Sequence, residues 1–275
     1  MSSRKFSLPT YLLALVFSVL AIFPFCWMAL SSVKPLQELY SVPPTWLPQN
    51  FSFENYTNVL FSSNIPRYFL NSVVISFGAT TISIFLAALA AYGFARFRFR
   101  GQGALQASIL ISQLLPTATV IVPLYIILGR LGLINTYAGV ILVYLIHTLP
   151  LCTWMLIGYF RALPFEIEEA ALVDGASRLL ILFRIVLPLS VPGIISTVVY
   201  CFVSTWNEFI FALVFATDRT VKTLPIGLAE FTSEFNTDWG SVMAASMIMT
   251  LPIVVLFFGV QKLFVGGLTA GATKG

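Results

Sequence analysis

The sequence predicts an all-α integral membrane protein, and two observations lead to that fold class. The chain of 275 residues is 58% hydrophobic and only 9% charged, with a mean hydropathy of +0.92. A soluble domain carries about 25% charged residues, so this chain cannot cover an ordinary water-facing surface. Its apolar residues also gather in about six runs, each close to the roughly 20 residues that a helix needs to cross a bilayer. The net charge of +4 is modest and gives no indication of nucleic-acid binding.

The first expected span, residues 8–30, follows Arg4 and Lys5. A cleaved signal peptide is the alternative for this run, but its apolar core would be only about 7–15 residues long. The remaining expected spans are 69–95, 104–128, 137–160, 189–216 and 242–264.

The distribution of basic residues sets the expected orientation. If the chain starts inside, ten Lys and Arg residues lie on inner segments and five on outer ones, which is the positive-inside bias. We therefore expect a multi-pass membrane protein with both termini in the cytoplasm and a single transmembrane domain over 1–275. Its parts would be outer loops at 34–68 and 217–240, a cytoplasmic loop at 164–188 and a cytoplasmic tail at 265–275. The inner bases are Arg4, Lys5, Arg96, Arg98, Arg100, Arg161, Arg178, Arg184, Lys262 and Lys274.

Three further segments carry local expectations. Loop 34–68 is rich in proline and aromatic residues, which predicts short ordered elements at the membrane interface, with carbohydrate stacking as the rarer use of such aromatics. Loop 217–240 is either an ordinary solvated loop or a docking surface for a partner protein. The alternating run Arg96-Phe97-Arg98-Phe99-Arg100 predicts an interfacial stop with its arginines facing water, and contact with a partner is the alternative.

The stretch 164–188 fits neither a membrane span nor a simple connecting loop. Acidic residues crowd its first half and basic residues its second, an order that the helix dipole favours. Gly175 falls where a first short helix could end, because glycine tolerates the left-handed conformation of a C-terminal cap. The pattern predicts a short helix, a turn and a second short helix on one membrane face.

The spacing in this stretch also resembles a known motif. Glu-Ala-Ala, three residues, Gly, nine residues and Ile-x-Leu-Pro is similar to the EAA loop of permease subunits of bacterial ABC importers. The matching residues are Glu169, Ala170, Ala171, Gly175, Ile185, Leu187 and Pro188. An amphipathic helix resting on lipid headgroups is the alternative reading. The Trp206-Asn207-Glu208 stretch and the Gly-rich C-terminus resemble the smaller subunit of maltose-type permease pairs.

The resemblance implies a type I importer fold in which the 164–188 loop is the cytoplasmic coupling helix, with Asp174 beside the matched residues. It places the chain in the bacterial cytoplasmic (inner) membrane, so the outer loops 34–68 and 217–240 would be periplasmic. It also implies a second homologous permease, two ABC ATPase subunits that carry ATP and Mg, an extracytoplasmic solute-binding protein and a sugar as substrate. The C-terminal Gly-Leu-Thr-Ala-Gly run lacks the order of a phosphate-binding loop, so we expect no ATP on this chain. The permease itself is expected to be non-catalytic and to bind no cofactor or metal.

Polar residues inside expected spans are candidates for the substrate pathway, because they are costly in lipid. Gln113, Asn207 and Glu208 are assigned to it, and contacts with a neighbouring helix are the alternative for Asn207 and Glu208. His147 is expected to be a hydrogen-bonded core residue, and the cysteines to be buried small hydrophobes. A secondary transporter or a membrane enzyme would need further intramembrane titratable groups or internal repeats, which the sequence does not offer.

Overall fold

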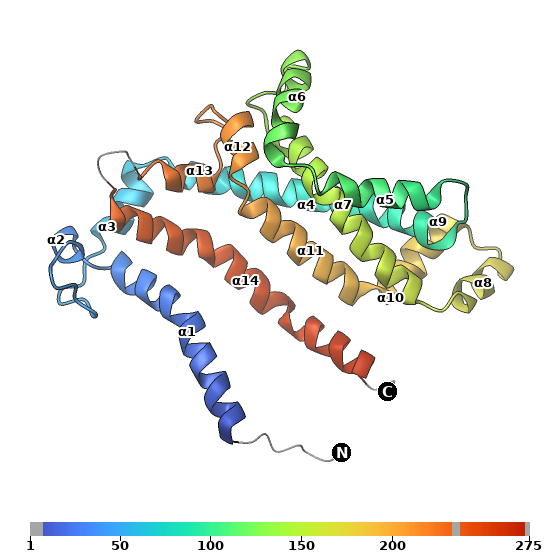
Figure 1. Ribbon diagram of the computed structural model, residues 1–275, viewed down its shortest axis with the longest axis horizontal. Coiled ribbons are helices and arrows are strands. Elements are labelled where there is room, and N and C mark those ends of the chain that lie inside the picture. Colours follow the sequence, from blue (N-terminus) through green and yellow to red (C-terminus); the bar gives the residue numbers. More distant parts are fainter. Residues whose placement is uncertain (1–7, 233–236, 273–275) are drawn as a thin grey trace. The chain divides into compact units, whose positions relative to one another are not determined.

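The computed structural model describes residues 8–232 and 237–272, and its regular elements in that part of the chain are helices (Figure 1). One isolated bridge joins Thr232 to Thr237. The N-terminal helices are α1 (Leu8–Ser32), α2 (Leu36–Leu39), α3 (Glu54–Thr57), η1 (Asn58–Ser62), α4 (Ile65–Arg96), α5 (Gln102–Ser112) and α6 (Thr117–Arg130). The central ones are α7 (Tyr137–Ala162), α8 (Glu166–Val173), α9 (Arg178–Ile181), η2 (Leu182–Val186) and α10 (Leu187–Leu189). The last are α11 (Val191–Trp206), α12 (Ile210–Phe215), α13 (Leu224–Ala229) and α14 (Trp239–Ala272). The predicted all-α class is confirmed.

Four helices in the described part are long and apolar enough to cross a membrane, and two bent pairs bring the number to as many as six. The four are α1, α4, α7 and Trp239–Gln261 of α14. The expected span 104–128 is not one straight helix, because α5 and α6 meet at 99° (Figure 1). Pro116 lies at the break, and proline disfavours helix both at its own position and at the residue before it.

The expected span 189–216 is likewise divided. The helical segments Arg178–Leu189 and Val191–Trp206 meet at an angle of 83°. A second break follows where α11 ends at Trp206, since α12 begins only at Ile210. Asn207 and Glu208, which were expected inside a membrane helix, therefore lie at a break between two helices. Several prolines are accommodated without such a break, among them Pro24 in α1 and Pro150 in α7. Neighbouring helices can satisfy the backbone groups that such prolines free.

The described part of the chain forms two compact units. The first contains the described residues up to Pro66 together with Gly227–Leu251. In it, buried Asn55 donates from Nδ2 to the carbonyls of Ser32 (3.0 Å) and Lys34 (2.9 Å), which closes the end of α1. Lys34 is itself buried, 4.9 Å from the Trp27 ring, and donates to the Thr45 carbonyl. Loop 34–68 is therefore ordered around short helices, as predicted.

The same loop is organised by one carboxylate. Glu38 accepts hydrogen bonds from Thr45 Oγ1 (2.7 Å), Gln49 N (3.0 Å) and Asn50 N (3.5 Å). These bonds favour the ionised form, so they hold the pKa of Glu38 below its ordinary value, the Thr45 hydroxyl contributing most. Trp46 on this loop is 69% exposed, which fits the predicted place at a membrane interface.

The second unit comprises Arg67–Ile226 and the chain from Pro252 onward. Its core has two parts. The first cluster joins α4, α7 and α12 and includes Ile75, Val143 and Phe215. The second cluster joins α4, α7 and the segment from α9 to α11, and its buried residues are Ala87, Ala88, Ala91, Tyr92, Cys152, Leu156, Ile157, Phe160, Ile181, Leu182, Val186 and Cys201. The alanines of α4 allow close approach of the neighbouring helices, as expected for packing in lipid.

The start of loop 217–240 is tied to this unit. Asn135 accepts at Oδ1 from the Thr217 backbone (2.7 Å) and the Asp218 backbone (3.0 Å). Asn71 of α4 donates to the carbonyls of Thr220 (3.1 Å) and Lys222 (2.8 Å). Hydrogen bonds from Thr220, helped by nearby positive charge, lower the pKa of Asp218. This part of the loop is therefore held in place rather than merely solvated; Glu234, also counted in the loop, is outside the described residues.

Candidate functional site

The 164–188 segment has the predicted helix–turn–helix form. Helix α8 carries three glutamates in its first turn and ends at Val173, and Gly175, two residues later, has φ +83°. Gly175 N donates to Leu172 O (3.0 Å) and Ala176 N to Ala171 O (3.0 Å), the pair of bonds that defines a Schellman cap. Ser177 then caps α9 by accepting from Leu180 N at 3.3 Å. Capping thus fixes both ends of the turn around Gly175.

The two faces of α8 differ sharply. Residues three or four positions apart share one side of a helix. The exposed side is made of Glu166, Glu169, Ala170 and Val173, the last 88% exposed. The opposite side is made of Glu168, Ala171 and Leu172, where Glu168 is buried and the other two pack against the second cluster.

The residues matched to the EAA motif fall into an exposed group and a group that packs against the chain itself. Glu169, Ala170, Asp174 and Gly175 are exposed and free to meet a partner. Ile185 and Leu187, by contrast, pack against the second cluster of their own chain, as Ala171 does, and Pro188 lies in α10. The motif therefore combines an outward half that presents a surface with an inward half that holds it.

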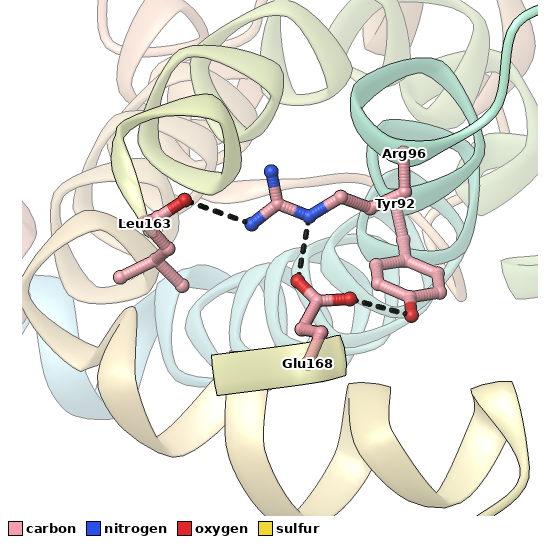
Figure 2. Close-up of polar contacts among 4 residues, drawn as sticks. All are labelled: Tyr92, Arg96, Leu163 and Glu168. Carbon is pink, nitrogen blue, oxygen red and sulfur yellow. Dashed lines mark hydrogen bonds and ion pairs between the residues drawn. The ribbon is translucent and has the colours of Figure 1, made fainter. Parts of the chain in front are cut away.

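A buried ion pair fixes the inward side of α8 (Figure 2). Arg96, the last residue of α4, donates from Nε to Glu168 Oε1 at 2.6 Å, and the two side chains are only 5% and 2% exposed. Tyr92, one turn earlier on α4, donates to Glu168 Oε2 at 2.9 Å. The guanidinium also donates from Nη2 to the Leu163 carbonyl at 3.2 Å and lies 5.7 Å from the Phe165 ring. The end of α4 thus holds the entrance to α8 at three points.

Arg96 contradicts the prediction that every arginine of the 96–100 run faces water. Its side chain is buried and paired with Glu168. An acid on the buried face of an amphipathic helix needs a partner, because an unpaired charge in the interior is costly. The inward position of Glu168, three residues before Ala171, was the signal that could have pointed to such a partner.

A second candidate region lies at the α5–α6 bend. A cavity of about 310 Å³ is lined by Ser112, Gln113, Leu115, Thr117, Val120, Ile146, His147, Pro150 and Phe211. Gln113 donates from Nε2 to the His147 carbonyl at 3.1 Å, and the His147 ring lies 5.9 Å from that of Phe211. His147 is thus a half-buried wall residue rather than a core residue.

Of the three predicted pathway residues, the structure brings only Gln113 to this cavity. Both carboxylate oxygens of Glu208 are taken by the α12 N-terminus, accepting from Phe211 N and Ala212 N at 3.0 Å each. Asn207 is exposed and donates to Val203 O at 2.9 Å. Glu208 therefore acts on the cavity indirectly, by fixing the helix that carries Phe211.

Among the described residues, no group of three or more His, Cys, Asp or Glu side chains is placed to hold a metal ion. Cys152 and Cys201 are buried as expected, but Cys26 on α1 is exposed on the surface of the chain. This exposure is compatible with contact between Cys26 and lipid, because α1 is apolar and long enough to span a membrane.

Three relatives resemble nearly the whole chain. The inner membrane ABC transporter permease protein YcjP of Escherichia coli is 38% identical over 262 residues, covering 94% of each chain. The trehalose/maltose transport system permease protein MalG of Thermococcus litoralis is 38% identical over 270 residues and 95% of each chain. The diacetylchitobiose uptake system permease protein DasC of Streptomyces coelicolor is 33% identical over 95% of each.

The fold is shared with solved transporters. A chain of a bacterial ABC transporter involved in the import of the acidic polysaccharide alginate matches with a TM-score of 0.80 at 21% identity, over 96% of this chain and 98% of that one. The family profile described as "Binding-protein-dependent transport system inner membrane component" matches residues 83–269, which contain both candidate regions. This chain therefore belongs to the family of inner membrane components of binding-protein-dependent transport systems.

Proposed function

We propose that this chain is the permease subunit of an ABC importer that moves a carbohydrate into the cytoplasm, with the exposed face of α8 as its contact with an ATPase subunit. The observation that carries the proposal is the two-sided α8, an outward face of Glu166, Glu169, Ala170 and Val173 on a helix fixed from behind by Arg96. Two of the relatives, one named for trehalose/maltose transport and one for diacetylchitobiose uptake, support the carbohydrate class.

The mechanism that fits this geometry is mechanical. ATP and Mg would be bound and turned over on two partner ATPase subunits, whose closure displaces α8. Because Arg96 is the last residue of α4 and binds Glu168, Leu163 and the Phe165 ring, a displacement of α8 pulls directly on a membrane-spanning helix. Acidic side chains on the outward face favour a basic cleft on the partner. In this arrangement the 164–188 segment, both termini and the 265–275 tail lie in the cytoplasm.

The remaining partners follow from the same proposal. A second homologous permease would complete the pathway, and an extracytoplasmic solute-binding protein would deliver the sugar. The anchored start of the 217–240 loop supports a role in that docking, since Asn71 and Asn135 give it a fixed shape. A preformed loop loses less conformational entropy when a partner binds.

We place the substrate pathway at the α5–α6 cavity. Gln113 offers an amide to sugar hydroxyls there, and the rings of His147 and Phe211 offer a surface for stacking. Asn207 and Glu208 lie in the break before α12, the helix that carries Phe211. Substitution of Gln113 by alanine should raise the substrate concentration for half-maximal uptake; unchanged uptake kinetics would remove Gln113 from the pathway.

The coupling proposal is tested by purifying the tagged chain from its native membranes and identifying what remains bound. The wild type should retain an ABC ATPase subunit. Glu169→Lys reverses a charge on the outward face, and Gly175→Pro removes the N–H that bonds Leu172 and cannot adopt φ +83°. Both should lose the ATPase while still inserting into the membrane.

Glu54→Lys is the matched control, because Glu54 is also an exposed acid in the first turn of a short helix but lies in the 34–68 loop. It should retain the ATPase. If all variants bind alike, or if the wild type binds none, the coupling surface is misassigned. Uptake that survives ATP depletion but fails with a protonophore would favour the secondary transporter instead.

A further inference from the structure

Beside the coupling helix, the ends of three helices enclose a pocket of about 500 Å³. Helix α4 ends there, α5 begins and α7 finishes, and the wall is mostly polar. The side chains that matter for its chemistry are Arg96, Arg98, Gln102, Gln106 and Arg161. The proposed coupling mechanism uses only Arg96 of these residues.

The pocket carries positive charge that its own walls do not balance. Arg96 is neutralised by Glu168. Arg98 and Arg161 are exposed, and neither has a carboxylate within ion-pair distance in the part of the chain that the structure describes. Helix α5 adds the positive end of its dipole, with no acidic residue in its first turn. Two guanidinium groups and a helix start therefore face the same space without a counter-charge.

The polar groups of the pocket are held in position by one carbonyl. Phe94 O accepts from Gln102 Nε2 at 2.7 Å and from Arg161 Nη2 at 3.4 Å, which joins α5 and α7 to the end of α4. Gln106, one turn further along α5, has an inaccessible Nε2 with no hydrogen-bond partner among the described residues. Buried donors are normally satisfied, so this amide would serve a bound acceptor only after its side chain turns toward the pocket.

We propose that this pocket binds the phosphate group of an anionic phospholipid. Guanidinium groups match phosphate oxygens with paired, charge-assisted hydrogen bonds. The pocket lies at the ends of α4 and α7, both of membrane-spanning length, which is the depth at which lipid headgroups are found. Phe97, which is 44% exposed, is part of the pocket wall, and Leu105, which is 52% exposed, lies on α5 between the lining residues Gly103 and Gln106; both offer apolar surface for the acyl chains. Basic pockets between spanning helices are known to take anionic headgroups.

The choice of lipid over other phosphates follows from this setting. A free phosphate would use the guanidinium groups alone, whereas a lipid also covers Phe97 and Leu105. Because Arg96 lines the pocket and also holds Glu168, a bound lipid phosphate would adjoin the contact that positions α8. The proposal concerns lipid binding by this chain and does not depend on which solute is transported.

The test is native mass spectrometry of the purified full chain in detergent, titrated with phosphatidylglycerol and, separately, with phosphatidylcholine. The wild type should retain phosphatidylglycerol in preference to phosphatidylcholine. Arg98→Gln and Arg161→Gln should each weaken phosphatidylglycerol binding by about tenfold or more, because each removes a charge-assisted contact. Arg100→Gln is the matched control: Arg100 is exposed in the same segment but does not line the pocket, so affinity should be unchanged. Circular dichroism of each variant verifies that the helices are intact.

Three results would overturn the proposal. Equal retention of the two lipids, or equal loss in Arg98→Gln and Arg100→Gln, would show that the pocket does not recognise the headgroup. Displacement of phosphatidylglycerol by millimolar inorganic phosphate would make it a free-anion site. Variants that keep phosphatidylglycerol but lose a co-purifying ATPase subunit would make the two arginines a protein-docking surface.

Discussion

The buried pair of Arg96 and Glu168 gives the sharpest prediction. Glu168→Gln removes the charge that balances a guanidinium whose side chain is only 5% exposed. Leaving one partner of a buried ion pair uncompensated typically costs about 3–5 kcal/mol. The Leu163 carbonyl still accepts from Arg96 at 3.2 Å, so we expect the lower end of this range, about 3 kcal/mol. Each 1.4 kcal/mol is tenfold in an equilibrium constant, so α8 should open about a hundredfold more often.

Amide hydrogen exchange measures this opening directly. In the purified chain, protection of the α8 amides should fall about a hundredfold in Glu168→Gln, and by a smaller factor in Tyr92→Phe, which removes one hydrogen bond. Glu166→Gln is the matched control, since Glu166 lies in the same first turn but on the exposed side. Its α8 amides should exchange at the wild-type rate.

A double variant distinguishes the energy of the Arg96–Glu168 ion pair from the separate contributions of the two residues. Replacing a whole buried ion pair by apolar side chains is often close to neutral, so Arg96→Met combined with Glu168→Leu should recover most of the lost protection. If the losses of protection in Arg96→Met alone and in Glu168→Leu alone simply add in the double variant, the two residues are not coupled. Unchanged α8 protection in Glu168→Gln would refute the reasoning altogether.

Three further predictions rest on single residues. Gly175→Ala should lower stability by about 1–2 kcal/mol, because φ at this position is +83°. Gly158→Ala should be neutral or stabilising, because Gly158 lies inside helix α7 and an added Cβ would meet open space. The thermal unfolding midpoints of the two variants test this difference. Glu208→Ala should cost about 1 kcal/mol in the same assay, because both oxygens cap α12, and an unchanged midpoint would exclude that capping role. The pKa of Glu38 is lowered by the hydrogen bonds that it accepts within the 34–68 loop. The stabilisation from these bonds is therefore present above the ordinary pKa of 4.5 and is lost as pH falls through the lowered pKa. Exchange of the Gln49 amide should rise in that acid range in the wild type, and in Glu38→Gln it should be fast and independent of this titration.

The sequence predicted well what depends on neighbours along the chain. The ends of α8 are set by local signals, the acidic first turn and Gly175, and both lie where the pattern placed them. Pro116 was also a local signal for a break, but it was not used when 104–128 was predicted as one span, and the 99° angle had no such signal. Each of these features is decided within a few residues, so a linear pattern can report it.

Contacts between distant segments were not predictable in the same way. Arg96 and Glu168 are 72 positions apart, and nothing in the 96–100 run distinguishes Arg96 from Arg98 or Arg100. Glu208 was judged by its polarity in an apolar run, which cannot reveal that both oxygens would be used by the next helix. Side-chain pairing of this kind depends on the tertiary arrangement, so it cannot be predicted from composition or local sequence.

The length of α8 explains why its two faces depend on each other. Eight residues make a helix about 12 Å long. Isolated helices shorter than about 12–15 residues are marginal in water, so α8 is helical because its caps and its inward contacts stabilise it. The outward face of Glu166, Glu169, Ala170 and Val173 consequently exists only while Glu168 is held.

Two kinds of coupling defect should therefore be distinguishable. Glu169→Lys should abolish ATPase retention while α8 stays protected from exchange, because only the surface has changed. Glu168→Gln should weaken retention together with protection, because the surface itself is lost. If Glu168→Gln loses the ATPase while α8 remains fully protected, then Glu168 contacts the partner directly, and the separation of the motif into an outward and an inward half is wrong.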